Sequence, residues 1–194
     1  MSLDSIMFLR GIFDMAASAH NRFAVDGLSQ LILAADAITQ ADAAGCKLVV
    51  FGNGGSAADA QHLAAELVGR FETERRPLAA IALTTDTSVL TAIANDYGYE
   101  HVFARQIEAL GRKGDVAFGI STSGRSANVQ AGLTAAKKRG MVTIALTGRD
   151  GGPIGADANI HLNVAESSTA RVQEVHQTIV HALCALVDQR VISA

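Results

Sequence analysis

The chain has 194 residues, of which 49% are hydrophobic, 18% are charged and only 2 are prolines. This length suggests one domain with a hydrophobic core, and the apolar fraction excludes a generally disordered chain. A formal net charge of −3 favours neither nucleic acid nor an anionic membrane as a partner, and no apolar run approaches the roughly 20 residues of a membrane helix. Cys46 and Cys184 match no CxxC motif and are too few for a disulfide framework, so we expect reduced thiols in a cytoplasmic protein.

The first 45 residues have a helical pattern. Between Leu28 and Ile38 apolar residues recur at steps of three and four, which places them on one helical face. A break at residues 21–27 predicts two helices instead of one. Because these helices have no strand of their own to cover, we expect their apolar faces at an interface between copies of the chain.

From Lys47 onward the pattern changes to short apolar runs separated by helix-forming stretches. The runs are Leu48–Phe51, Leu78–Leu83, Val116–Ile120, Val142–Leu146 and Ile160–Leu162. Such runs are typical of parallel strands that are covered on both faces. The prediction is an α/β fold with a doubly wound parallel sheet of about five strands, two extra N-terminal helices and a last helix over Thr169–Val191.

A glycine-rich turn, GNGGSA at residues 52–57, follows the first predicted strand and leads directly into helix-forming sequence. Glycines let the backbone turn sharply and bring N–H groups close to an anion, and the helix N-terminus adds a partial positive charge. The turn matches the loose dinucleotide pattern GxGxxA, but no acidic residue follows at the expected distance of about 20 residues. The Walker lysine is also absent from it. An ordinary tight turn with a serine cap is the alternative.

A second turn, STSGRS at residues 121–126, follows the third predicted strand and contributes four hydroxyl groups. Ligands of open α/β sheets bind outside the carboxyl ends of the strands, so both turns are expected to face one crevice. Hydroxyl and N–H groups suit a terminal phosphate, which has three oxygens to satisfy. The two turns therefore predict a site for a phosphomonoester.

Two helices carry candidate titratable groups. His62 and Glu66 are four residues apart on the helix after the first turn, so they share a face and form either a functional pair or a solvated surface pair. On the last helix, His176 borders the apolar stripe and is interpreted as a core-edge residue, whereas His181 lies on the polar flank as a surface residue. Gln173 and His181 are about 12 Å apart along the helix axis and could share a metal only if it lay between them.

Five segments together carry a resemblance to a known family: FGNGGSAADAQHLAAE, TTDTSVLTAIANDYGY, GDVAFGISTSGRSANV, ALTGRDGG and RVQEVHQ. They resemble the sugar isomerase (SIS) domain family, over nearly the whole chain. The resemblance implies a flavodoxin-like fold with residues 1–194 as a single SIS domain, of which residues 1–45 form a helical pair for oligomerisation. It also implies a homotetramer with active sites between subunits, and no direct partnership with nucleic acid or membranes.

The activity that the resemblance implies is conversion of D-sedoheptulose 7-phosphate to D-glycero-D-manno-heptose 7-phosphate through an enediol. This step belongs to heptose biosynthesis for surface lipopolysaccharide. In that reading Glu66 is the general base and His181 the general acid, and zinc is held by His62, Glu66, Gln173 and His181. The substrate-binding residues implied are Asn53, Gly54, Gly55, Ser56, Glu66, Asn95, Asp96, Ser121, Thr122, Ser123, Ser126 and Gln173. Ala170 stands where many members carry an acidic residue.

Two other functions stay open. The family includes a non-catalytic tetramer that binds a replication initiator, and the segment RFETERRP at residues 70–77 resembles it. Because that relative lacks the glutamate corresponding to Glu66, this residue discriminates between the two. The other alternative is an isomerase or sensor of a different sugar phosphate, since phosphate loops bind the shared end of many sugars.

Overall fold

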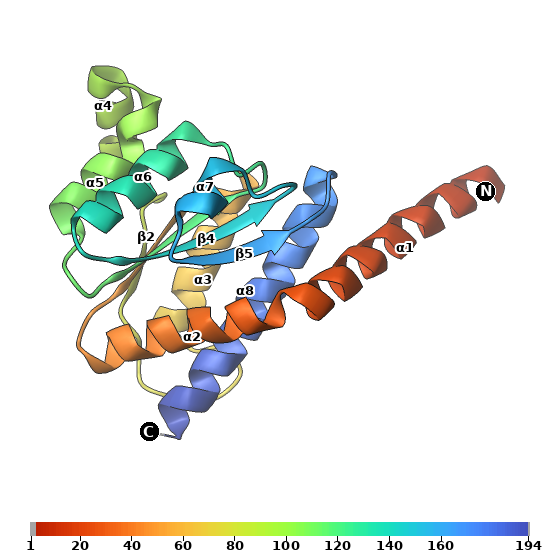
Figure 1. The fold of residues 1–194 in the computed structure, drawn as a ribbon, viewed down its shortest axis with the longest axis horizontal. Helices are drawn as coiled ribbons and strands as arrows, with labels where there is room; N and C mark the ends of the chain where they lie inside the picture. Colours follow the sequence, from red (N-terminus) through yellow and green to blue (C-terminus); the bar gives the residue numbers. More distant parts are fainter. Residues whose placement is uncertain (1–2, 194) are drawn as a thin grey trace.

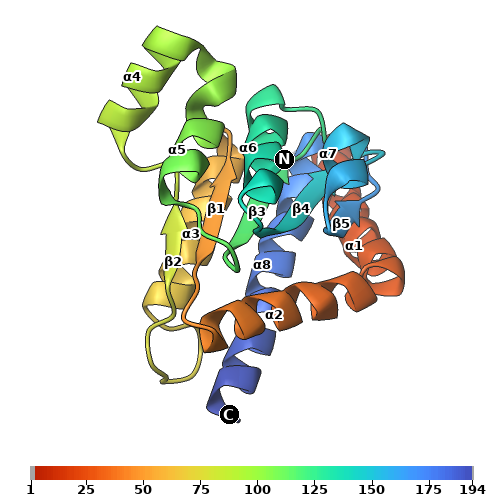
Figure 2. The ribbon, with the colours of Figure 1, turned by 60° about the vertical axis from the view of Figure 1, so that its left-hand side comes forward.

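The computed structural model describes residues 3–193; residues 1, 2 and 194, which the predicted domain also includes, lie outside the described part. Its centre is a parallel sheet in the order β2-β1-β3-β4-β5, drawn in Figures 1 and 2. The strands are β1 (Leu48–Gly52), β2 (Ala80–Ala82), β3 (Val116–Ser121), β4 (Val142–Gly148) and β5 (Ile160–Val164). The predicted doubly wound, flavodoxin-like topology is confirmed, with its switch point between β1 and β3.

Helices cover both faces of the sheet (Figure 2). On one face lie α1 (Leu3–Asp26), α2 (Leu28–Ala43), α3 (Gly55–Val68) and α8 (Thr169–Ile192). The other face carries α4 (Thr87–Tyr97), the 3-10 turn η1 (Tyr99–His101), α5 (Val102–Leu110), α6 (Ala127–Lys138) and α7 (Gly152–Asp157). Because all the strand pairs are parallel, the carboxyl ends of the five strands lie at one edge of the sheet.

Alternate residues of the strands fill two hydrophobic cores. Val50 and Phe118 belong to the core beneath α2, α3 and α8, whereas Val49, Phe51 and Ala117 belong to the core beneath α5 and α6. Strand side chains point to opposite faces in turn, so a strand buried on both faces reads as a continuous apolar run. This explains why the apolar runs located the strands in the sequence.

Two predicted boundaries were wrong. The helical break is confined to Gly27, so α1 continues through residues 21–26; a Cβ at Gly27 would lie 2.3 Å from the Phe23 ring. The second strand covers three residues instead of six. Leu78 lies outside the strand because its N–H donates to the carbonyl of Leu67 at the end of α3, not to a neighbouring strand.

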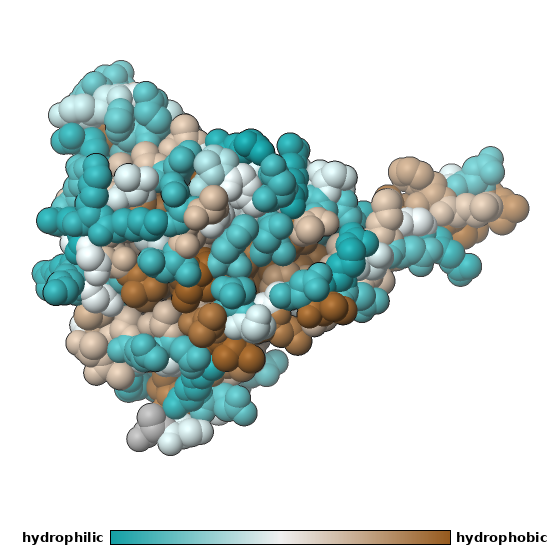
Figure 3. Space-filling model, viewed as in Figure 1, coloured by the Kyte–Doolittle hydropathy of each residue, from teal (hydrophilic) through white to brown (hydrophobic). Residues whose placement is uncertain are grey.

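The N-terminal half of α1 projects from the body of the molecule (Figure 1). Its exposed large hydrophobic residues are Leu3, Ile6, Met7, Phe8, Leu9, Phe13 and Met15. Figure 3 shows apolar surface on this helix and over α2. Within residues 3–193, no helix has the length and hydropathy needed to span a membrane. Cys46 and Cys184 are free thiols, as predicted.

His176, interpreted from the sequence as a core-edge residue, is fully buried on α8. Its Nε2 donates to the Thr147 carbonyl at 3.0 Å, and its Nδ1 has no hydrogen-bond partner among the described residues. Burial lowers the pKa of His176 to about 4, because the charged ring is poorly solvated in the core.

This burial predicts a pH-dependent stability. Between about pH 6.5 and pH 4, His176 is protonated in the unfolded chain but stays neutral in the folded chain. The free energy of unfolding should therefore decrease as the pH is lowered from about 6.5 to about 4. Each pKa unit corresponds to about 1.4 kcal/mol, so the loss is on the order of 3 kcal/mol. Urea titrations of the parent and of His176→Gln measure this; equal slopes against pH would contradict it.

Candidate active site

The two glycine- and hydroxyl-rich loops meet at the carboxyl edge of the sheet. They follow β1 and β3, which pair directly, with Gly52 opposite Ile120. Asn53 of the first loop and Asn128 of α6 form a reciprocal amide pair, in which each Nδ2 donates to the other's Oδ1 at 2.8 Å. Tyr99 also donates its hydroxyl to Asn53 Oδ1 at 3.1 Å. The first loop is therefore joined to the helix that follows the second loop, and both loops lie at the same edge of the sheet, as predicted.

The second loop gathers its hydroxyl groups over the start of α6. Ser121 Oγ lies 2.9 Å from Ser126 Oγ and 3.4 Å from Ser123 Oγ, and the N–H of Arg125 donates to Ser123 Oγ at 3.2 Å. Thr122 is half-buried in the same turn. Hydroxyls that contact one another and an N–H at a helix N-terminus can all turn toward one anion.

Gly124 sets the shape of this loop. Its φ is +65°, and a Cβ would lie 2.2 Å from the carbonyl oxygen of Gly151 in the loop after β4. We expect Gly124→Ala to displace the loop and raise the KM for a sugar phosphate. Gly45→Ala is the matched control, because Gly45 has φ +71° with no atom within 4 Å of the added Cβ. Equal KM values in the two variants would contradict the prediction.

The first loop turns through Gly54, which has φ +56°, and enters α3 at Gly55. Ser56 is buried, and its N–H donates to the Asn53 carbonyl at 3.0 Å. Gln173 of α8 lies directly over this turn, because a Cβ on Gly55 would be 2.0 Å from Gln173 Nε2. The absence of a side chain at Gly55 thus lets the α8 amide approach the loop.

A second cluster lies further along α3 and α8. His62 Nε2 is 3.0 Å from Glu66 Oε1 and 3.4 Å from His181 Nε2, and the two imidazole rings meet edge to face with centroids 5.0 Å apart. The Phe71 ring packs on His181 at 5.6 Å. The Glu66 side chain is 24% exposed, so it is half-buried and not directed into open solvent. His181 is exposed, as its position on the polar flank predicted, yet it has a partner on another helix.

Two imidazole nitrogens and a carboxylate oxygen match the ligand chemistry of zinc. In residues 3–193, however, no group of three or more His, Cys, Asp or Glu side chains has the arrangement of a formed metal site. The donor atoms of His62, Glu66 and His181 contact one another at hydrogen-bond distances instead. The donor atoms of His62, Glu66 and His181 therefore fit the metal by their chemistry, whereas Gln173 contacts the first loop at Gly55 and lies apart from these three.

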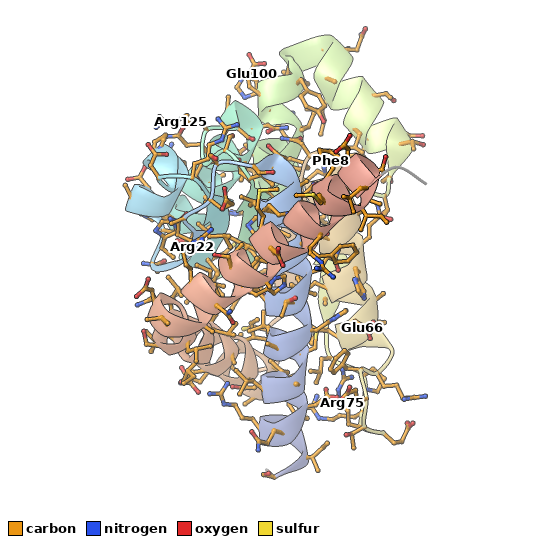
Figure 4. The ribbon with its side chains drawn as sticks, turned by 90° about the vertical axis from the view of Figure 1, so that its right-hand side faces the viewer. Phe8, Arg22, Glu66, Arg75, Glu100 and Arg125 are labelled. Carbon is orange, nitrogen blue, oxygen red and sulfur yellow. The ribbon has the colours of Figure 1, made fainter. Side chains whose placement is uncertain are left out.

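The loop and the cluster occupy different levels of α3. Gly55 and Glu66 are separated by eleven residues, or about 16 Å of helix axis. In Figure 4, Glu66 lies beside α8, well below Arg125 of the second loop. A phosphate bound at the first loop of one chain would thus lie about three helical turns away from the Glu66 of that chain.

Asn95 and Asp96 are in the last turn of α4, as predicted, but lie apart from the other candidates. Asn95 Nδ2 donates to Asp96 Oδ1 at 2.8 Å, and both residues are exposed. No hydrogen bond described for residues 3–193 joins them to the loops or to the His62 cluster. Their role in sugar binding stays a prediction.

Several polar residues around the site were not identified from the sequence: Asp59, Arg75, Asn128, Gln177 and Asp188. Arg75 is the clearest example, since its guanidinium donates to the carbonyls of Glu66 at 2.7 Å and Leu67 at 2.8 Å, at the end of α3. It also pairs with Asp188 of α8 at 2.7 Å. No local pattern marks such residues, because their partners are distant in the chain.

A family model described as the SIS domain matches residues 13–148. The chain belongs to the SIS domain family. The phosphoheptose isomerase of Geobacter sulfurreducens is 58% identical over 156 residues, which are 80% of this chain and 82% of that protein. The solved phosphoheptose isomerase of Neisseria gonorrhoeae superposes with a TM-score of 0.90 at 47% identity, covering 94% of this chain and 98% of the other. That of Francisella tularensis gives 0.92 at 38% identity, covering 97% and 100%. The SIS domain here thus resembles those of these isomerases along nearly its whole length.

Proposed function

We propose that this SIS domain is a phosphoheptose isomerase, which converts D-sedoheptulose 7-phosphate to D-glycero-D-manno-heptose 7-phosphate. The single observation that carries the proposal is the presence of Glu66, half-buried and paired with His62 and His181, in a chain 58% identical to a phosphoheptose isomerase. A carboxylate in such a position can take a proton from carbon. The product would supply heptose for surface lipopolysaccharide, and the reaction would take place in the cytoplasm.

The chemistry requires one hydrogen to move between two carbons. Glu66 takes a proton from C1 of the ketose, which leaves an enediol across C1 and C2, and returns a proton to C2. His181 moves a proton between the oxygens of C1 and C2, so that the carbonyl is transferred from C2 to C1. The phosphate is held by the hydroxyl groups of Ser121, Ser123 and Ser126, which contact one another in the second loop.

We include zinc in this proposal. His62, Glu66, Gln173 and His181 would hold the ion, which supplies a Lewis acid for the charge that develops on the sugar oxygens. Treatment with a chelator followed by gel filtration is expected to abolish turnover, and added zinc is expected to restore it. Full turnover in protein from which metal analysis detects no zinc would contradict this part of the proposal.

The proposal also includes a homotetramer with active sites between subunits. It is supported by the exposed apolar residues of the projecting α1 and by the separation of the loops from Glu66 along α3. A second chain would cover the apolar helix and would bring another Glu66 toward the loops. Sedimentation equilibrium measures the assembly, and a monomer that turns over substrate would contradict it.

The deciding experiment is an assay with a panel of five- to seven-carbon sugar phosphates. We expect turnover of sedoheptulose 7-phosphate and thermal stabilisation by it in preference to shorter sugars. Preference for a hexose 6-phosphate would assign another sugar-phosphate isomerase. Absence of turnover with stoichiometric capture of a replication initiator would assign the binding tetramer. The segment 70–77 does not by itself favour that role, since its Arg75 has a structural position at the end of α3.

A further inference from the structure

Asp59 and Gln177 form a buried polar connection behind His62 that the proposed reaction does not use. Gln177, on α8, places its Oε1 3.0 Å from His62 Nδ1. The Nε2 of the same amide donates to Asp59 Oδ1 on α3. Asp59 is only 3% exposed, and its Oδ2 has no hydrogen-bond partner among the described residues. The buried carboxyl group of Asp59 thus holds the Gln177 amide, and this amide contacts Nδ1 of the His62 ring.

The orientation of the Gln177 amide follows from its partners. Gln177 Nε2 donates to Asp59 Oδ1, so the carbonyl oxygen of the same amide faces His62. Because that carbonyl only accepts hydrogen bonds, the ring nitrogen opposite it, Nδ1, must carry a hydrogen. Nε2 faces the Glu66 carboxylate, which also accepts hydrogen bonds, so a hydrogen on Nε2 is the one that a metal ion would displace, while Nδ1 keeps its own.

His62 Nε2 is the atom that faces the other candidate ligands, Glu66 Oε1 at 3.0 Å and His181 Nε2 at 3.4 Å. In the neutral tautomer without a hydrogen on Nδ1, Nε2 would carry the only hydrogen and could not bind a metal ion. Metal-binding histidines generally donate their second ring nitrogen to an oxygen, which fixes both the tautomer and the ring orientation. The oxygen of Gln177 is in the position to do this for His62.

We propose that Gln177, oriented by the buried Asp59, is a positioning residue that keeps a hydrogen on Nδ1 of His62 and so leaves Nε2 as the nitrogen that binds zinc. This inference rests on the proposed function for its metal. The hydrogen bonds from Asp59 through Gln177 to His62 join α3 to α8 and orient the His62 ring in the absence of metal. Since the two residues lie behind His62, they act through the ring and not on the substrate.

The test uses the full-length chain with ¹⁵N-labelled histidine. The ring nitrogens of His62 are assigned by their loss in His62→Asn, and their shifts report which nitrogen carries the hydrogen. We expect a hydrogen on Nδ1 of His62 in the zinc-free parent, and its loss from Nδ1 in Gln177→Leu, where the hydrogen on Nε2 facing Glu66 remains. The zinc dissociation constant of Gln177→Leu should rise by about 10- to 100-fold. Gln189→Leu, the same change at an exposed position of α8, should alter neither quantity.

A pair of substitutions separates positioning from simple packing. Gln177→Glu places a second carboxylate against Asp59, and Asp59→Asn lets the Gln177 amide take either orientation, so each single variant should bind zinc more weakly. In the double variant, the new amide on α3 can donate to one oxygen of the new carboxylate on α8, while the other oxygen of that carboxylate accepts from His62 Nδ1. We therefore expect the double variant to recover the hydrogen on Nδ1 and most of the zinc affinity.

The inference is overturned if Gln177→Leu keeps the hydrogen on Nδ1 and the parent zinc affinity, if the double variant is no better than the single ones, or if the parent binds no zinc. Failure of the proposed function looks different. If the parent does not turn over sedoheptulose 7-phosphate, yet the variants change the protonation of Nδ1 and the zinc affinity as described, the positioning role stands on its own.

Discussion

Glu66→Gln is expected to lower kcat for sedoheptulose 7-phosphate by about 10²- to 10⁴-fold, the usual contribution of a positioned acid or base. The amide is close in shape to the carboxylate, so it can keep the contact with His62 while losing the ability to take a proton from carbon. We expect little change in KM, because the phosphate is held by the two loops. Initial-rate measurements with zinc-saturated protein test this.

Glu74→Gln is the control for the loss of one negative charge. Glu74 is 87% exposed and pairs only loosely with Arg70, at 3.6 Å. Its variant should retain the parent kcat, and the zinc content of both variants should be measured to separate loss of the base from loss of the metal. A Glu66→Gln protein that turns over at the parent rate would remove the general base from the mechanism.

Arg75→Ala is expected to lower the free energy of unfolding by about 3–5 kcal/mol, because it leaves the Asp188 carboxylate buried without a partner. The side chains of Arg75 and Asp188 are only 2% and 6% exposed. Removal of Arg75 also takes a donor from the carbonyl of Glu66, and leaves the carbonyl of Leu67 with only the N–H of Leu78. Figure 4 shows Arg75 beyond Glu66 at the end of α3. Urea denaturation at constant protein concentration measures the effect.

Arg76→Ala is the neighbouring control. Arg76 is 58% exposed and pairs with Asp42 at 2.5 Å, so solvent screens the pair and its loss should destabilise the fold far less than the loss of Arg75. The double variant Arg75→Met, Asp188→Leu removes both buried charges and should recover part of the stability lost in Arg75→Ala. If Arg75→Ala and Arg76→Ala were equally stable, the buried ion pair would not hold α3 to α8.

Much of the fold could be predicted because its signals are local. The apolar runs at Leu48–Phe51 and Val116–Ile120 mark strands buried on both faces, and the turns after them mark the crevice. The second strand was overestimated, since Leu78 is as apolar as a strand residue but bonds to Leu67 of α3. Whether an apolar residue joins a strand depends on which backbone groups lie beside it, and periodicity does not report that.

Only part of the candidate site could be predicted from local sequence patterns. His62 and Glu66 share a helical face, so spacing alone placed them together. His181 looked like a surface residue, and its contact with His62 depends on the packing of α8 against α3. Asn128, buried and paired with Asn53, gave no sequence signal at all.

By itself the sequence determined the order and type of the elements, the position of both loops and the helical pairing of His62 with Glu66, because each depends on residues within a few positions of one another. The tertiary structure alone decided that Gln177 and Asp59 face His62, and that Arg75 and Asp188 join the end of α3 to α8. These contacts span more than one hundred residues of chain. They exist only because burial removes water as a partner and leaves each polar group to be satisfied by whichever side chain the packing of the helices brings opposite.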